Sequence, residues 1–156
     1  TDFEYHNDPE KTKSAYEFNG WPTNGDIGYV DDDGWLFLTD RRSHMIISGG
    51  VNIYPQESEN VLTLHPAVKD VAVIGVPNKE FGEEVKAVVI PEDGYAPGPE
   101  LEAELIDYVR SRLAGYKCPK SVDFVEALPR LETGKLLKRE LRNRYWGDAE
   151  VKTAAM

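Results

Sequence analysis

Two β-branched runs constrain the fold of this chain more than any other feature of its sequence. The runs VKDVAVIGV at 68–76 and VKAVVI at 85–90 are apolar on both faces. Strands of this kind are typical of the centre of a sheet, where neither face meets water. The sequence therefore predicts two central strands, covered by the helices that the flanking segments supply.

Two of these helices have clear start and stop signals. One opens at Pro55, because proline suits the first helical position, and Pro66 closes it. The other covers Glu100–Leu113, with acidic residues at its start and Gly115 after its end. Its apolar residues recur at four-residue spacing, as in an amphipathic helix: Leu101, Leu105, Val109 and Leu113.

A short alternating strand, VDFV at 122–125, and a third helix follow. We expect this helix to run from about Leu136 to Tyr145, with Thr133 as its N-terminal cap. From residue 44 onward, the pattern therefore predicts a small α/β (α+β) domain, in which about three helices cover a short mixed sheet.

Two hairpins are predicted before the central strands. One is GDIGYVDDDGWLFLTDR, from Gly25, and the other is MIISGGVNIYP, with a glycine pair at its turn. Residues 1–24 show no helical or strand period, so we expect them to be mobile in the isolated chain. Residues 1–40 look like the edge of a different body, and the polar segment TDRRSHM at 39–45 is the candidate linker.

Charge and composition exclude several classes of function. The net charge is −10, from 28 acidic and 18 Lys or Arg residues, which argues against nucleic-acid and anionic-membrane partners. The single cysteine excludes an intrachain disulfide, and the three histidines lack metal-ligand spacing, so we expect no metal site. No apolar run is long enough to span a bilayer, and a cytoplasmic location is expected.

One basic segment departs from this acidic background. PRLETGKLLKRELR, at 129–142, places Lys135 after a glycine just before the predicted third helix. A lysine there can reach a phosphate or a carboxylate, or it can simply be solvated. A Walker P-loop is excluded, because Pro129 stands where that motif needs its first glycine and Leu136 where it needs Ser or Thr.

Other candidate binding residues are equally ambiguous when each is taken singly. Asp26 could accept hydrogen bonds from a ribose or belong to a turn, and Arg41 could bind an anion or solvate the linker. Gly49-Gly50 could let a ligand pass close to the backbone or form a tight hairpin turn. Phe81 could stack on a base or anchor its loop.

The joint order of these motifs is far more specific than any one of them. In sequence, they are GDIGYVDDDGWLFLTDR, MIISGGVNIYPQESENVL, HPAVKDVAVIGVPNKEFGEEVKAVV and YKCPKSVDFVEALPRLETGKLLKREL. This series resembles the C-terminal part of the adenylate-forming enzymes, and most of all the acyl-CoA synthetases, also called fatty-acid CoA ligases. The resemblance extends from about Gly20 to Trp146.

The resemblance implies a division into parts of a longer enzyme. Residues 1–40 would be the C-terminal edge of a large AMP-binding N-terminal domain, 41–43 the hinge with Arg42 and Ser43, 44–147 a mobile C-terminal domain, and 148–156 a tail. The N-terminal domain of the same enzyme would then be a partner of this region. The enzyme would use ATP to convert a carboxylic acid to acyl-AMP with release of pyrophosphate, and CoA would then displace AMP.

The resemblance also implies roles for individual residues. Lys135 would bridge the acyl carboxylate and the α-phosphate during adenylation, Asp26 would bind the ribose hydroxyls, and Arg41 would contact the ribose or phosphate. The SGGVNIYP loop would line the pantetheine tunnel, and further residues would contact the CoA nucleotide. The CoA set consists of Ser48, Gly49, Gly50, Phe81, Tyr116, Cys118 and Lys120. A lysine acetyltransferase acting on Lys135 is a further implied partner.

Two departures from the family pattern qualify these roles. At the hinge, the family has Lys or Asp after DR-x, whereas this chain has Ser43 and His44. The phosphate loop, the magnesium-binding glutamate and the acyl pocket of the family are absent, so Mg²⁺ would be held by the N-terminal domain. We therefore expect the chain to be inactive in isolation, and the acid it serves is open.

Two alternative functions remain open from the sequence. The acyl group could pass to the phosphopantetheine of a carrier protein instead of CoA. Alternatively, the chain could be a non-enzymatic module that binds a nucleotide or CoA.

Overall fold

The structure is a computed structural model that describes residues 3–16 and 20–147. The chain forms two compact units, with the boundary after Ser43. The 148–156 tail expected from the sequence lies outside the described residues. Within the described residues, no helix has the length and apolar content needed to cross a membrane.

The first unit holds a short helix and a hairpin. Strands β1 (Asp26–Val30) and β2 (Leu36–Arg41) pair antiparallel, which confirms the predicted hairpin. Although residues 1–24 show no helical or strand period in the sequence, α1 spans Pro9–Ala15. The mobility of this segment in the isolated chain stays a prediction. The start signal of α1 is local, since the Asp8 carboxylate accepts the Lys11 N–H at 3.0 Å.

The second unit is built on a five-stranded mixed sheet. Its strands are β3 (Ile46–Ser48), β4 (Val51–Ile53), β5 (Val68–Asn78), β6 (Gly82–Pro91) and β7 (Ser121–Phe124), in the order β4-β3-β6-β5 with β7 also on β6. Only the β6–β7 pair is parallel. Of the two long strands that the sequence predicts as central, β6 has neighbours on both sides. The prediction is wrong for β5, which pairs only with β6 and lies at the edge of the sheet, although both of its faces are covered.

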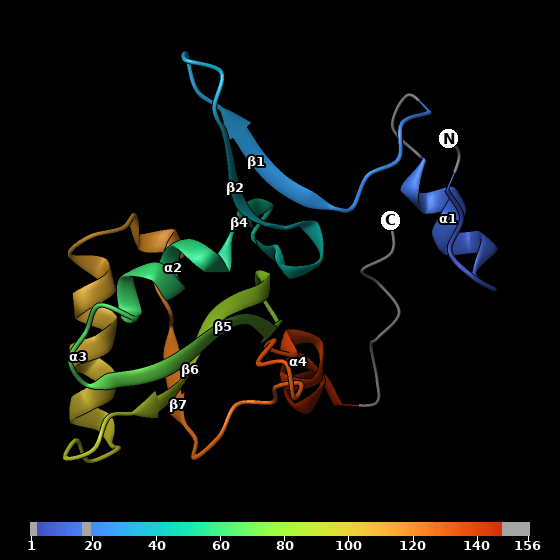
Figure 1. Cartoon of the computed structure of the whole chain (residues 1–156). Helices are drawn as coiled ribbons and strands as arrows, with labels where there is room; N and C mark the ends of the chain where they lie inside the picture. The colour runs from blue at the N-terminus through green and yellow to red at the C-terminus, as the bar shows by residue number, and fades with distance from the viewer. Residues whose placement is uncertain (1–2, 17–19, 148–156) are drawn as a thin grey trace. The chain divides into compact units, whose positions relative to one another are not determined.

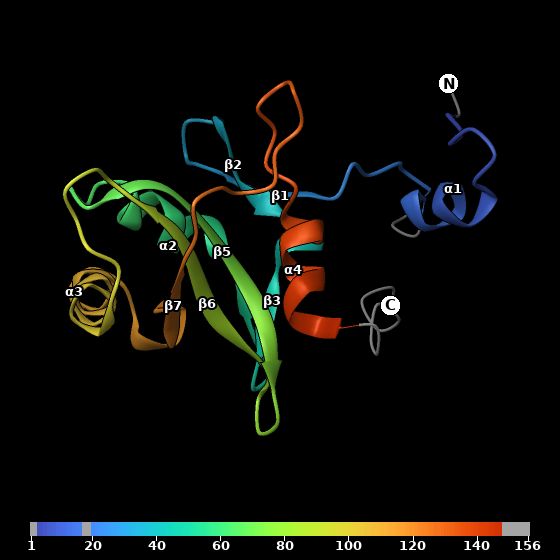
Figure 2. The same ribbon diagram turned by 90° about the horizontal axis from the view of Figure 1, so that it is seen from below.

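Three helices cover this sheet on its two faces, which confirms the predicted α+β class. They are α2 (Pro55–Leu62), α3 (Pro99–Arg110) and α4 (Lys138–Trp146), and two 3₁₀ turns, η1 (Arg42–His44) and η2 (Gly115–Lys117), lie outside them. Helices α2 and α3 lie on one side of the sheet and α4 on the other (Figures 1 and 2).

Alternate residues of β5 enter two separate cores, one on each face. Val71 and Val73 pack with Leu62 of α2 and with the α3 leucines. Their neighbours Ala72 and Ile74 pack instead with Leu141 of α4. This arrangement explains the sequence pattern, because a strand between two cores must be apolar on both faces.

The predicted start of the last helix is wrong by two residues. Helix α4 begins at Lys138, and its cap position is Leu137 without a side-chain bond, so Thr133 is not its cap. The cause is a small antiparallel bridge between Arg130 and Leu136, which holds the chain extended where helix was expected. The strand predicted at 122–125 lies at Ser121–Phe124. The helix predicted over Glu100–Leu113 spans Pro99–Arg110, so its predicted end is three residues too late.

Candidate active site

Lys135 follows a tight turn at the start of the α4 region. The Gly134 N–H donates to Leu131 O at 2.8 Å, and the Leu131 N–H donates to Lys135 O at 2.9 Å. Gly134 has φ +84°, the left-handed conformation that closes three-residue loops of this kind and that glycine adopts without strain. Lys135 itself is exposed, so its ammonium faces solvent from a defined backbone position.

Arg130 ties this turn to the sheet. Its Nε and Nη2 donate to both carboxylate oxygens of Asp70 in β5, at 2.6–3.2 Å, and its Nη1 donates to Gly134 O at 2.7 Å. Two-pronged pairs of this geometry are the strongest arginine–carboxylate contacts. Neither Arg130 nor Asp70 was among the residues selected from the sequence. Their contact joins positions 60 residues apart, and local patterns within a single sequence carry no signal for it.

A buried ion pair supports the other side of the turn. Lys138, at the start of α4, lies 2.7 Å from Glu59 of α2, and both residues are buried. Glu59 also accepts the Val73 N–H at 2.7 Å, so it satisfies a backbone donor of β5. The start of α4 is therefore fixed to the sheet and to α2.

The Gly49-Gly50 pair forms the turn between β3 and β4. The φ values are +56° and +81°, and positive φ at both central residues is what a type I′ hairpin turn requires. Ser48 pairs with Gly82, and the Gly49 N–H donates to Phe81 O at 2.9 Å. A Cβ on Gly49 would come within 3.1 Å of the Phe81 ring, whereas a Cβ on Gly50 would meet nothing within 4 Å.

The structure thus brings most of the predicted CoA residues to one edge of β6. Lys120 donates its N–H to Val85 O at 2.8 Å, three positions from Gly82 on the same strand. Tyr116 lies in η2, and its ring is half exposed. Cys118 differs, because it is 1% exposed and burial raises the pKa of its thiol. Its side chain belongs to the core and not to this surface.

The Lys135 turn and the Gly49-Gly50 turn lie at opposite ends of the sheet. The Lys135 turn is tied through Arg130 to Asp70 near the start of β5, and Gly49 is tied to the β5–β6 turn, where Asn78 pairs with Gly82. At about 3.3 Å per residue, the intervening length of β5 separates the two ends by roughly 25 Å. Figure 2 shows the loop before α4 and the β5–β6 turn at these two ends.

Glu83 links the two ends through α4. Its carboxylate accepts the Ile47 N–H of β3 at 3.3 Å and pairs with Arg142 of α4. Burial raises the pKa of Glu83, and Arg142 and the Ile47 N–H, which favour the carboxylate, offset only part of that effect. Gly75 leaves room for this carboxylate, since a Cβ there would come within 2.3 Å of it.

Asp26 and Arg41 meet in the first unit. They are directly opposite each other in the β1–β2 hairpin, and Arg41 Nε lies 3.2 Å from Asp26 Oδ1. The Arg41 side chain is 52% exposed and the Asp26 side chain 35%, so a ligand could reach both. The predicted hinge residues Arg42 and Ser43 lie in η1, at the boundary between the two units.

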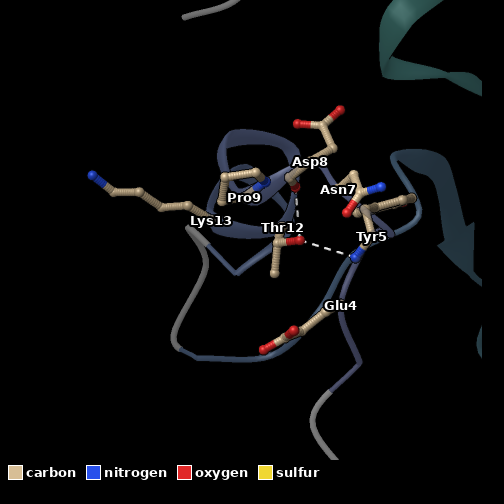
Figure 3. A pocket seen from close by; sticks show the side chains of 7 residues that line it. All are labelled: Glu4, Tyr5, Asn7, Asp8, Pro9, Thr12 and Lys13. Atoms are coloured by element: carbon tan, nitrogen blue, oxygen red, sulfur yellow. Dashed lines mark hydrogen bonds between the residues drawn. The ribbon is translucent and has the colours of Figure 1, made fainter.

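A shallow pocket lies beside α1 in the first unit. In Figure 3, Thr12 accepts the Tyr5 N–H and donates to Asp8 O, both at 2.9 Å. Its polar groups thus bond to one another, and the sequence analysis selected none of the lining residues. These are Glu4, Tyr5, Asn7, Asp8, Pro9, Thr12 and Lys13. Among the described residues, no cluster of His, Cys, Asp or Glu could hold a metal ion.

Comparison with known proteins gives consistent relatives. The AMP-binding enzyme C-terminal domain family matches residues 57–135. The long-chain-fatty-acid–CoA ligase FadD13 of Mycobacterium tuberculosis is 47% identical over 142 residues, and the fatty acid–[acyl-carrier-protein] ligase ScoC of Streptomyces coeruleorubidus is 42% identical over 149 residues. These matches cover 91% and 96% of this chain, but only 27% and 28% of the relatives.

Solved structures agree with these relatives. The crystal structure of ATP-bound MatB from Rhodopseudomonas palustris superposes with a TM-score of 0.78 at 40% identity. The match covers 88% of this chain and 27% of that one. The chain therefore spans about a quarter of the length of the proteins that it resembles.

Proposed function

The chain belongs to the AMP-binding enzyme C-terminal domain family, and on that premise we propose that it is the C-terminal part of an AMP-forming fatty-acid CoA ligase. The observation that carries the proposal is the placement of an exposed lysine and a glycine-only turn at opposite ends of one small domain. Each end suits one of the two half-reactions of such an enzyme.

In the first half-reaction, a carboxylate oxygen of the acid attacks the α-phosphate of ATP. The new bond is O–P, and pyrophosphate leaves with the electrons of the broken P–O bond. Two anions must approach each other, so a cation between them stabilises the charge that develops in the transition state. Lys135 supplies that cation, and Asp26 accepts hydrogen bonds from the ribose hydroxyls while Arg41 balances its charge.

In the second half-reaction, the thiolate of CoA attacks the acyl carbonyl carbon, and AMP leaves. The pantetheine arm is long and thin, so it needs an open path beside backbone and not a charged side chain. The Gly49-Gly50 turn provides such a path, because nothing lies within 4 Å of a Cβ at Gly50. Phe81, Tyr116 and Lys120 would contact the nucleotide end of CoA.

The exposed hairpin supports the proposal that a large N-terminal domain precedes this region. Consecutive β2 residues point to opposite faces, yet Leu36, Phe37 and Leu38 are each at least 45% exposed. A two-stranded sheet that is apolar on both faces needs cover from more protein. That domain would bind the acid and hold the Mg²⁺ that accompanies ATP.

An ATP–pyrophosphate exchange assay tests the proposal. The full-length protein that carries this region should catalyse exchange with a fatty acid, and the 156-residue chain should give none, because triphosphate binding is incomplete in it. A panel of fatty, aromatic and short-chain acids then identifies the substrate. Exchange by the 156-residue chain, or none by the full-length protein with any acid, would contradict the proposal.

Transfer to a carrier protein is the second candidate, because ScoC matches 96% of this chain. Supplying the preformed acyl-AMP with either CoA or a phosphopantetheinylated carrier protein separates the two. Our proposal predicts a faster reaction with CoA.

A further inference from the structure

We propose that Arg130 is a positioning residue for Lys135, held for this purpose by Asp70. The inference rests on the proposed function and adds a residue pair to its adenylation step. Arg130 would act only through Lys135 and would touch neither ATP nor the acid.

The geometry places Arg130 between the sheet and the lysine turn. Three of its bonds go to the two carboxylate oxygens of Asp70, and a fourth, from Nη1 at 2.7 Å, goes to Gly134 O. The guanidinium is a flat, rigid fork, so these bonds fix its plane as well as its place. Its donors are engaged inside the domain, which leaves little capacity for a phosphate.

The bond to Gly134 O acts directly on Lys135. That carbonyl and the Lys135 N–H belong to one planar peptide unit, so holding the oxygen also restrains the direction of the N–Cα bond of Lys135. The turn is otherwise closed by backbone bonds at its base, from Leu131 N to Lys135 O and from Leu137 N to Pro129 O. Arg130 adds the link from this turn to β5, which pairs with β6 along its whole length.

This link matters because Lys135 has no support of its own. The side chain is exposed, and in the part of the chain that the structure describes its ammonium forms no ion pair or hydrogen bond. The place of that ammonium therefore depends on the backbone turn. A misplacement of about 1 Å at a reacting centre can cost up to about 10²-fold in rate.

The test uses the full-length protein with Arg130→Lys and Asp70→Asn. Lysine keeps the charge at position 130 but cannot form the fork, and asparagine keeps the shape at position 70 but removes the charge. Each should lower the single-turnover rate of adenylation about 10-fold, with the KM for ATP and the rate of thioester formation from supplied acyl-AMP changed by less than about 2-fold. Arg110→Lys is the matched control, because Arg110 pairs with Asp107 at 2.8 Å on the exposed face of α3.

The double variant Lys135→Ala/Arg130→Lys separates positioning from a structural role. If Arg130 acts only through Lys135, the double variant should adenylate no more slowly than the single variant Lys135→Ala. Hydrogen exchange of residues 129–137 should rise in Arg130→Lys and Asp70→Asn but not in Arg110→Lys, and this readout does not depend on activity.

Three outcomes would overturn the inference. A raised KM for ATP would mean that Arg130 binds the nucleotide itself, a further loss in the double variant would mean that it acts independently, and unchanged exchange of residues 129–137 would mean that it does not hold the turn. If Lys135→Ala adenylates normally, the proposed function fails first. If Lys135→Ala is slow but Arg130→Lys equals Arg110→Lys, only the positioning role fails.

Discussion

The Lys135 end and the Gly49-Gly50 end of the sheet differ in what they present to a ligand. At the first, one charged side chain extends from a turn that Arg130 and Asp70 tie to the sheet. At the second, two consecutive glycines have no side chain. Their positive φ values form a tight turn, and the space beside Gly50 is open. A developing charge needs a fixed cation, whereas a passing substrate arm needs space, so the contrast is the one expected from the two steps that we propose for this domain.

The two ends are nevertheless parts of one compact unit. Helix α4 starts beside the Lys135 turn and pairs through Arg142 with Glu83, which also holds the Ile47 N–H next to the glycine turn. We therefore propose that the two steps would alternate by movement of the whole unit about the predicted hinge at Arg42 and Ser43, and not by rearrangement within it.

The largest effect should come from a change that lowers the stability of the whole second unit, which carries both ends of the sheet. Glu59→Gln leaves the buried Lys138 ammonium without a counter-charge, which should cost about 3–5 kcal/mol of unfolding free energy. Urea unfolding of the 156-residue chain measures it. The control is Glu59→Gln/Lys138→Met, which removes the buried charge and leaves an amide oxygen for the Val73 N–H. This double variant should be more stable than Glu59→Gln, and equal or lower stability would show that the pair is not what fixes α4.

A smaller effect should be confined to the glycine end. Gly50→Leu should slow thioester formation from supplied acyl-AMP at least about 10-fold, because the side chain enters the open path and the left-handed backbone adds about 1–2 kcal/mol of strain. Adenylation should be unaffected. Gly94→Leu controls for strain, since Gly94 also has positive φ, +94°, and open space around it, but lies outside the proposed path. Equal slowing by both variants would mean that strain, and not the path, is responsible.

The smallest effect should come from Asp123, which lies at neither end. Burial tends to raise its pKa, but hydrogen bonds from Lys86 and Tyr145, both at 2.7 Å, lower it below the ordinary value of 3.8. The unfolded state then binds more protons, so this stabilisation is complete above pH 3.8 and is lost as the pH falls. Asp123→Asn should cost about 1 kcal/mol at pH 7, a low value because the carboxylate is partly exposed.

Urea unfolding at pH 7, 4 and 3 checks this prediction. The difference between the wild type and Asp123→Asn should shrink toward the lowest pH, and both half-reactions should keep their rates at pH 7. A difference that grows as the pH falls would contradict the assignment of the lowered pKa.

Local patterns in the sequence predict most of the fold. The apolar runs of β5 and β6 report burial on both faces, and the Gly49-Gly50 pair reports its turn, because in each case the signal lies within a few residues. The start of α4 was misplaced because Leu136 bridges to Arg130 across the Gly134 turn. The α1 helix was missed because its seven residues are too few to show a period. The sequence does contain a start signal for this helix, because Asp8 is a good N-cap and Pro9 suits the first helical position.

The candidate site divides in the same way. The glycines and Lys135 stand out because their motifs are contiguous. The ties that hold them, Arg130 to Asp70 and Arg142 to Glu83, join residues about 60 positions apart, and only the fold brings these residues together.

Single-turnover kinetics of Lys135→Ala in the full-length protein test the central claim most directly. Adenylation should fall by about 10²-fold or more, because a preorganised cation is lost from the developing charge, while thioester formation from supplied acyl-AMP should be nearly unchanged. Lys69→Ala, which removes an exposed lysine beside Asp70, should leave both steps intact. Equal slowing of both steps by Lys135→Ala would contradict the assignment of the two half-reactions to the two ends of the sheet.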